Sequence, residues 1–462
     1  MTPKRETPMR GRDFFAAVVD ALARRRPPYT PERPYRSRSF AGRLLAALAR
    51  DSAAPPPRDF NILWVSQSLS DLGSAISALA MTLLVLALTG SPVQAGLVGT
   101  IGLVMTVLCR LPAGVLVDRV DRRRIMLACD AVRLVAYLVL GLAVLDGRAT
   151  LGLVIAVTAV CSACNALFGT AEYSSLRNIV LPEQLPAAIA RNEARSYGAT
   201  LAGPPVGGLL FGIGPALPFF GDAITFLASL VGVSLVRGPL QEPHDGESAS
   251  HTAALAEGFR FVFGNPFLRT ILLIAAPLNL AIHGIIFTII VTLQADGVAP
   301  GIIGTVQTVV AVGGLLGALA APALHRRFPL PVLIRGICWV AALLMSASAM
   351  LTHSVAAAIP VALAVFLGPA SNAALFGHQA AITPDRMQGR VVSVIIVVAT
   401  SVSAAAPLGA GILIDKLGSE VTVLVFAAVV ACSALAASLG RGLRSGEMTS
   451  GSNQTPDTKS EL

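Results

Sequence analysis

The chain has 462 residues, of which 54% are hydrophobic and 13% are charged, and its formal net charge is +9. This composition excludes an ordinary soluble domain, because the charged residues are too few to cover a polar surface. The basic residues flank apolar segments or lie in the amino-terminal arm, so the positive charge does not indicate nucleic-acid binding. We therefore expect a membrane protein whose partners include the lipid bilayer and no nucleic acid.

Residues 1–59 form a polar arm that is rich in arginine and proline. Its best apolar run, residues 14–23, is interrupted by Asp20, so the arm holds no signal-peptide core. Apolar residues recur at helical spacing beside two arginines, as in a helix lying on an anionic membrane: Phe40, Arg43, Leu44, Leu45, Leu48 and Arg50. A disordered arm or a misassigned start codon is the alternative. We expect a disordered tail at 441–462.

Apolar segments about 20 residues long, the length that a helix needs to cross the hydrocarbon layer, recur between residues 60 and 440. The predicted spans are 60–88, 94–117, 125–145, 150–171, 191–212, 217–236, 269–293, 301–323, 330–351, 354–377, 389–414 and 419–440. The predicted fold class is therefore an all-α polytopic membrane protein with twelve transmembrane helices. Two six-helix bundles, 60–236 and 269–440, are joined by a linker at 237–268.

The distribution of arginine between alternate connections predicts the orientation of the chain. Most basic connection residues fall on one side, which marks the cytoplasm: Arg119, Arg122, Arg123, Arg124, Arg177, Arg191, Arg237, Arg260, Arg326, Arg327 and Arg386. The opposite connections hold only Arg148 and Lys416. We expect both termini in the cytoplasm and the protein in a bacterial plasma membrane.

The two halves of the chain share a sequence pattern. Four residues of the first half correspond, at one constant offset, to residues of the second half: Pro182 to Pro384, Glu183 to Asp385, Pro205 to Pro407 and Gly207 to Gly409. Duplicated bundles that rock about a central site are common among transporters. The pattern thus predicts two related six-helix repeats.

The connection after the second span carries the most specific motif, which includes Gly114, Asp118, Arg119 and Arg122. It resembles the signature loop of the major facilitator superfamily. The resemblance implies a close helix approach at the glycine and a charge latch at Asp118, with Arg122 and the start of the eleventh span near Arg390 as partners. A helix amino terminus stabilises a carboxylate by about 0.3–1 kcal/mol. A basic loop that only sets the topology is the alternative.

Asp121 stands where that family often has a second glycine, and in this the chain resembles the enterobactin-exporter and macrolide-efflux branch. The fifth span contains Gly203, Pro204, Pro205, Gly207 and Gly208, which resemble the antiporter element of the superfamily. The resemblance implies export. Small residues also permit close helix crossings, so a packing face without transport meaning is the alternative.

Charged residues inside apolar spans are costly unless they are paired or face a cavity. On the first span Gln67, Asp71 and Ser74 share one helix face, and Asp71 is the first candidate for proton coupling. A hairpin at 118–124 would bring three further proton-coupling candidates, Arg110, Asp130 and Arg133, to one depth. A purely structural ion-pair cluster is the alternative. For Asp222 we expect a role at a helix start.

Polar residues on other spans are candidates for a substrate cavity: Thr158, Ser162 and Asn165 on the fourth span, and Asn279 and His283 on the seventh. Hydrogen bonds between helices are the alternative role for such residues. The chain also departs from the family that it resembles, because its fourth span lacks an arginine that many proton antiporters of the superfamily carry there.

No catalytic or nucleotide-binding motif accompanies these features, so we expect neither an enzyme nor a cofactor, and no metal site. Cys161 and Cys164 have CxxC spacing within an apolar span, which favours helix packing over redox or metal chemistry. The predicted function is proton-coupled efflux of an amphipathic small molecule, an antibiotic, siderophore or other metabolite, by a monomer. An importer of the same fold and a transporter-derived sensor or scaffold are the alternatives.

Overall fold

The computed structural model describes residues 57–241, 251–327, 330–384 and 387–439. The expected surface helix of the arm and the tail at 441–462 lie outside these residues. The described part is helical throughout and its elements, in chain order, are α3 (Arg58–Thr89), α4 (Pro92–Arg119), α5 (Arg122–Leu145), α6 (Leu151–Ile179), η1 (Pro182–Gln184), α7 (Leu185–Ile213), α8 (Leu217–Leu235), α9 (His251–Gly264), α10 (Pro266–Ala295), α11 (Pro300–Arg327), α12 (Leu330–Ala349), η2 (Val355–Ala357), α13 (Ala358–Phe366), α14 (Gly368–Ile382), α15 (Gln388–Ser403), α16 (Ala406–Leu417) and α17 (Ser419–Leu439).

Local sequence signals set many of the helix ends. Ser91 accepts a hydrogen bond from the backbone N–H of Gln94 at 3.4 Å, and Pro92 occupies the first helical position of α4. Helix α3 ends at Gly90, whose φ of +63° is the left-handed conformation that glycine adopts without a steric penalty. Asp121 starts α5 by accepting from the N–H of Arg124 at 3.0 Å.

Ten segments of the described chain are long and apolar enough to cross a membrane. Helices α7 and α12 occupy the places of the fifth and ninth predicted spans but are not among the ten. Charged Arg191, Glu193 and Arg195 in its first half, and glycine and proline in its second, lower the hydropathy of α7. The tenth and eleventh predicted spans are each divided, into α13 and α14 and into α15 and α16. Twelve spans agree with this element order.

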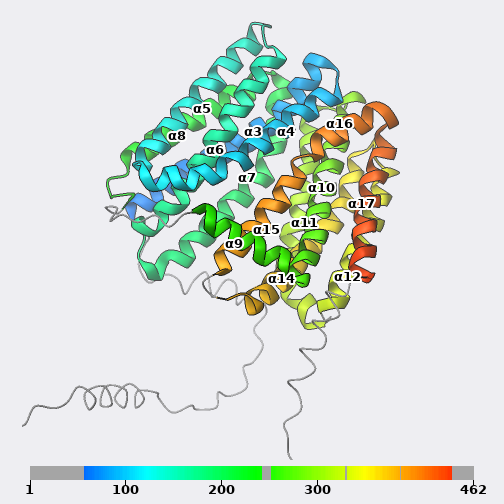
Figure 1. Ribbon diagram of the computed structural model, residues 1–462. Helices are drawn as coiled ribbons and strands as arrows, with labels where there is room; N and C mark the ends of the chain where they lie inside the picture. The colour runs from blue at the N-terminus through cyan, green and yellow to red at the C-terminus, as the bar shows by residue number, and fades with distance from the viewer. Residues whose placement is uncertain (1–56, 242–250, 328–329, 385–386, 440–462) are drawn as a thin grey trace, which may run out of the picture. The chain divides into compact units, whose positions relative to one another are not determined.

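The first six long helices, α3 to α8, pack mainly on one another, and α10 to α17 form a second group (Figure 1). The largest apolar core crosses between the groups, with Leu83 and Phe226 from the first and Ile285 and Ile289 from the second. Helix α9 lies in the segment 237–268, which we expected to be a plain linker, and it packs against α15 and α10.

The two most extensive helix contacts between the groups are those of α4 with α16 and of α7 with α11. On α4, Pro92, Gly96 and Thr100 recur at one constant offset as Pro300, Gly304 and Thr308 on α11. A Cβ atom on Gly96 would collide with the backbone of Pro407, and one on Gly304 with the backbone of Pro204 and Pro205. Thr100 accepts from the N–H of Leu408 at 3.1 Å, and Thr308 donates to the carbonyl of Leu201 at 2.7 Å.

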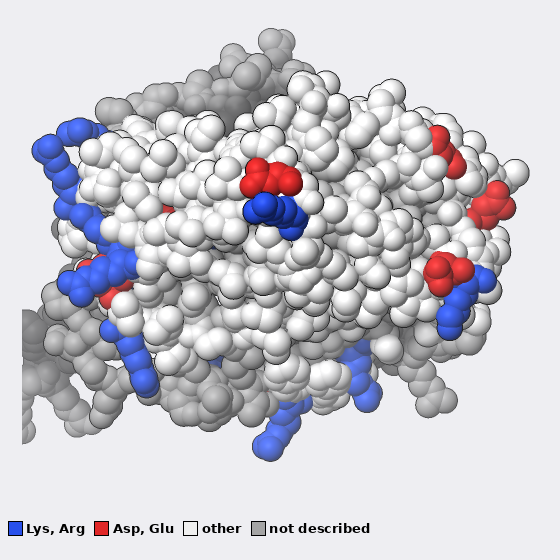
Figure 2. Space-filling view, turned by 90° about the horizontal axis from the view of Figure 1, so that it is seen from above, with Lys and Arg blue, Asp and Glu red and all other residues white. Residues whose placement is uncertain are grey.

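These two crossings are equivalent by the sequence repeat, and we call them together the seam. The seam lies toward the end of the bundle that carries the connections 90–91, 146–150 and 296–299, here named the distal end. The proximal end carries 120–121, 180–184 and α9. Figure 2 views the molecule from above and shows a mostly uncharged face with scattered acidic and basic side chains.

Candidate functional site

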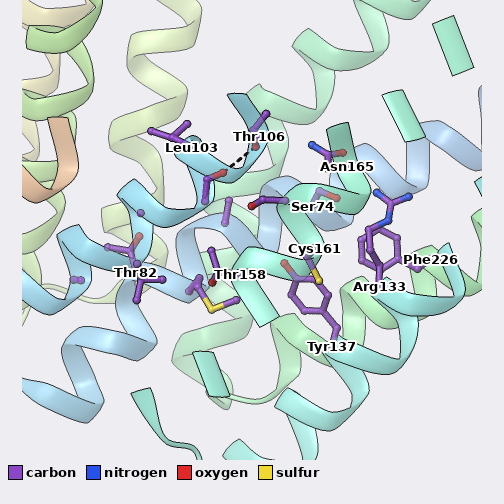
Figure 3. Close-up of a pocket in the computed structure, with 17 residues that line it drawn as sticks. Ser74, Thr82, Leu103, Thr106, Arg133, Tyr137, Thr158, Cys161, Asn165 and Phe226 are labelled. Carbon is purple, nitrogen blue, oxygen red and sulfur yellow. Dashed lines mark hydrogen bonds between the residues drawn. The ribbon is translucent and has the colours of Figure 1, made fainter. Parts of the chain in front are cut away.

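A cavity of about 280 Å³ lies among the first group of helices. Ser74 and Thr82 line it from α3, Thr106 from α4, and Thr158 and Asn165 from α6, as Figure 3 shows. Ser162 also lines it. Four residues predicted to line a substrate cavity thus share this one: Ser74, Thr158, Ser162 and Asn165. The rest of its wall is largely apolar, which suits an amphipathic molecule.

Arg133 and Phe226 close one side of this cavity. The Arg133 guanidinium lies over the Phe226 ring, 4.3 Å from its centroid, and over Phe168 at 4.7 Å. Arg133 also pairs with Asp130, which is fully buried. The predicted Asp130–Arg133 pair is therefore present, and aromatic faces hold its cation at the cavity wall.

Ser229 of α8 connects this pair to α3. It donates to Asp130 Oδ2 at 2.5 Å and accepts from Gln67 Nε2 at 2.7 Å. Gln67 therefore forms a buried contact between α3 and α8 and does not line the cavity. Arg110 does not join the cluster, because its side chain is exposed on α4. The hairpin predicted Arg110 beside the pair, but its side chain lies on an exposed face of α4.

Asp71 pairs with Arg195 of α7, whose Nε lies 2.7 Å from Asp71 Oδ2. The same guanidinium binds Glu172 of α6 through Nη1 at 2.7 Å and Nη2 at 3.3 Å. The Arg195 side chain is 8% exposed, against 33% for Asp71 and 11% for Glu172. One cation thus ties three helices together through two carboxylates, and the set carries one formal negative charge when all three groups are ionised.

Glu172 and Arg195 were not predicted as site residues from the sequence. They lie almost equally far before and after η1, the turn between α6 and α7, so a hairpin at that turn brings them to nearly the same depth. That signal was available in the sequence.

Asp222 is not a helix-start residue. Helix α8 begins at Leu217 after the capping residue Ala216, and Asp222 lies in its second turn, fully buried. Its carboxylate accepts from the hydroxyls of Ser77 and, at 3.1 Å, Thr225. Within the described part of the chain, no basic side chain forms an ion pair with it.

The residues of the predicted latch make several other contacts. Arg122 donates to the carbonyls of Ser174 and Leu240, at 3.0 and 3.1 Å. Arg390 pairs with Glu257 of α9. A Cβ on Gly114 would meet no atom within 4 Å, so the close helix approach expected there is wrong for this arrangement. Asp118 is partly buried and Arg119 is exposed.

The glycines of the fifth-span motif do lie at close helix crossings. A Cβ on Gly203 would collide with Ala75, one on Gly207 with Ile76, and one on Gly208 with Pro300. Pro204 and Pro205 contact Gly304 in the seam. This motif therefore packs α7 on both α3 and α11.

Asn279 and His283 lie on α10, away from the cavity described above. Asn279 Nδ2 donates to the carbonyl of Ala275 at 2.8 Å, and His283 Nδ1 lies 2.8 Å from the carbonyl oxygen of Asn279. Both groups are thus engaged within their own helix. Within the described ranges no cluster of three metal-ligating side chains occurs.

Comparisons with known proteins place these features in a family. The model of the Major Facilitator Superfamily matches residues 63–407. The chain is 28% identical over 387 residues to the multidrug efflux pump Tap of Mycobacterium tuberculosis, covering 79% of this chain and 89% of that one. It is 28% identical over 375 residues to Tap of Mycolicibacterium fortuitum, covering 76% and 88%.

Solved structures share the fold at low sequence identity. A bacterial homologue of the human lysosomal transporter Spinster, in an inward-facing and unoccupied conformation, superposes with a TM-score of 0.67 at 17% identity, covering 84% of this chain and 97% of that one. A bacterial homologue of the iron transporter ferroportin, in the inward-facing state, gives 0.62 at 15% identity, covering 82% and 98%. The chain therefore belongs to the major facilitator superfamily and is a multi-pass membrane transporter rather than an enzyme.

Proposed function

We propose that this transporter exports an amphipathic small molecule from a bacterial cell in exchange for protons, by alternating access. The observation that carries the proposal is the cavity, in which apolar walls and a few hydroxyl and amide groups lie beside the buried Arg133. The name of the similar pump Tap and the antiporter-like motif at 203–208 favour export over import.

The orientation follows from the charge distribution. Basic residues crowd the proximal end, including Arg122, Arg123 and Arg124, whereas the distal connections are poor in them. The positive-inside rule then puts the proximal end and both termini in the cytoplasm. In this orientation the seam closes the outer half of the molecule, so the substrate would enter the cavity from the cytoplasmic side.

Asp71 is the proposed coupling residue within the group of Asp71, Arg195 and Glu172. Two carboxylates compete for one guanidinium, so a proton can neutralise one of them while the cation stays paired with the other. Protonation of Asp71 would remove its ion pair with Arg195, which is one of the contacts that hold α3 on α7. Through the loss of this ion pair, proton binding would directly weaken the contact between α3 and α7.

The basic connection after α4 remains a proposed latch. Asp118 and Arg122 lie at the proximal end. Arg122 of α5 connects α6 with the segment near Leu240 by donating to the carbonyls of Ser174 and Leu240. Asp118→Asn should leave the protein folded and slow transport. Unchanged transport by this variant would leave the loop with a topological role alone.

The test uses purified full-length protein in proteoliposomes, with ethidium as a fluorescent amphipathic cation and a pH-sensitive dye inside the vesicles. An imposed proton gradient should drive uphill ethidium movement, and an uncoupler should abolish it. Asp71→Asn should keep insertion and downhill movement but lose uphill movement. Gradient-independent movement by the wild type would contradict proton coupling.

A cell-based measurement decides the direction. Expression should lower ethidium accumulation in a host that lacks its own pumps, and Asp71→Asn should restore accumulation. Increased accumulation on expression would support an importer. Absence of any flux in vesicles for a panel of cationic, neutral and anionic amphiphiles would support a sensor or scaffold.

A further inference from the structure

Asp222 is a buried acid of the first helix group that has no part in the proposed coupling at Asp71. Its carboxylate is fully buried between α8 and α3. Gly73 of α3 faces it, and a Cβ there would collide with both Asp222 Oδ1 and Thr225 Oγ1. The helix pair is therefore shaped around the carboxylate, which two hydroxyls hold in place.

A chain of hydroxyl groups connects this carboxylate with the cavity. Ser77 Oγ donates to Asp222 Oδ2 and lies 3.3 Å from the hydroxyl of Tyr137. Tyr137 lines the cavity from α5 and appears beside Cys161 in Figure 3. Asp222 itself does not reach the cavity, so Ser77 and Tyr137 are the groups that lie between them.

Every element packed against Asp222 contributes to its electrostatic setting. Arg133 and Tyr137 of α5 and Cys161 of α6 are the charged or titratable groups that act on it. Arg133 is already paired with Asp130, α3 offers Ser77, and α7 presents the apolar Leu210 beside Gly221. A buried carboxylate with no counter-charge of its own is held at lower cost when it carries a proton.

We propose that Asp222 is a proton-binding site of this transporter, loaded from the cavity through Tyr137 and Ser77. In the loading step a hydronium ion in the cavity gives a proton to the Tyr137 oxygen and becomes water, the Tyr137 proton passes to Ser77 Oγ, and the Ser77 proton passes to the carboxylate. Each hydroxyl ends with one proton, and the net change is neutralisation of Asp222. The inference rests on the proposed proton-coupled function and adds a second acid to it.

The first experiment needs no substrate. Infrared difference spectra of the full-length protein in lipid, between acidic and alkaline buffer, should contain a carboxyl band that shifts in heavy water and disappears in Asp222→Asn. Ser77→Ala and Tyr137→Phe should keep the band and slow its appearance after a pH jump at least tenfold. A band that is unchanged in Asp222→Asn would overturn the proposal.

The second experiment uses ethidium and a pH-sensitive dye in proteoliposomes. Asp222→Asn, checked for a monodisperse elution profile, should bind ethidium as the wild type does and lose ethidium-driven proton movement. Wild-type proton movement in this variant would overturn the inference while leaving the proposed function intact. Absence of proton movement in the wild type would instead contradict the proposed function, and the infrared band would still decide whether Asp222 binds a proton.

If Asp222→Asn does not fold, Gly73→Ala gives an independent test. The added methyl group displaces the carboxylate and Thr225 without changing any charge. It should alter the frequency of the carboxyl band. An unaltered band in folded Gly73→Ala would overturn the assignment of that band to Asp222.

Discussion

Arg195 binds Asp71 through its Nε at 2.7 Å, and the same guanidinium is held from the other side by Glu172. This sharing makes the single and double variants behave differently. Asp71→Asn and Glu172→Gln each leave the cation one partner, so each should lower stability by about 1 kcal/mol or less. Together they strand a buried guanidinium, which should cost about 3–5 kcal/mol.

Thermal unfolding in detergent measures this difference, with the fraction of monodisperse protein as a second readout. Adding Arg195→Leu to the double variant removes the stranded charge and should recover most of the loss. A double variant as stable as either single one would show that water solvates Arg195 and that the three groups do not act together.

The cavity makes a prediction about binding. A Cβ on Gly102 would lie 3.2 Å from Thr158 Cγ2 and 3.3 Å from Ser162 Oγ, so a leucine there would project into the cavity. Gly102→Leu should weaken ethidium binding, measured by fluorescence titration, by at least about tenfold, or about 1.4 kcal/mol. Gly152→Leu is the matched control, because a Cβ at Gly152 meets nothing within 4 Å. Equal affinities for both variants would place the binding site elsewhere.

Hydropathy and charge predicted the helix order, the two groups and most span boundaries to within a few residues, since a membrane span needs a long apolar run. The face on which a side chain lies could not be predicted. Arg110 was expected beside Asp130 and Arg133 but is exposed, because a nearly uniformly apolar helix carries little information in its sequence about its rotation.

The side-chain partners on neighbouring helices could not be predicted from the sequence either. Asp71 was singled out on α3, yet its cation Arg195 comes from a helix separated by more than a hundred residues. Asp222 was expected at a helix start because it follows a connection closely, and only the packing of α3 on α8 shows that Ser77 is its partner across the two helices. Side-chain pairing depends on helix rotation and contact, and periodicity within one helix does not specify either.

A variant at the contact between α9 and α15 should slow transport without lowering stability. Arg390 and Glu257 form an ion pair whose side chains are 40% and 45% exposed, so the pair should contribute about 0–1 kcal/mol to folding. Arg390→Glu should therefore leave the melting temperature nearly unchanged. If the contact holds α9 on α15 during transport, this variant should slow ethidium efflux by about tenfold, or 1.4 kcal/mol of activation free energy.

The charge-swapped double variant Glu257→Arg/Arg390→Glu is the control for that prediction. It recreates the pair with reversed signs and should recover efflux. Failure of the swap to recover efflux would mean that Arg390 acts through another group, for which Asp118 of the proposed latch is the candidate.

The seam predicts how bulky side chains would affect the closed distal end. A Cβ on Gly411 would collide with the backbone of Pro92, whereas a Cβ on Gly409, in the same helix, meets nothing within 4 Å. Gly411→Leu should hold α16 away from α4, while Gly409→Leu should fit without strain. Because the contact joins the two repeats and not the interior of either one, both variants should fold and insert.

Cysteine cross-linking reports the separation directly. The Thr100 hydroxyl oxygen lies 3.1 Å from the backbone nitrogen of Leu408. A disulfide between cysteines that replace Thr100 and Leu408 should therefore form readily in a cysteine-free background. Gly411→Leu should suppress that cross-link and slow efflux, and Gly409→Leu should change neither. Cross-linking that survives Gly411→Leu would contradict the steric argument, because the two helices could then approach without a glycine at their crossing.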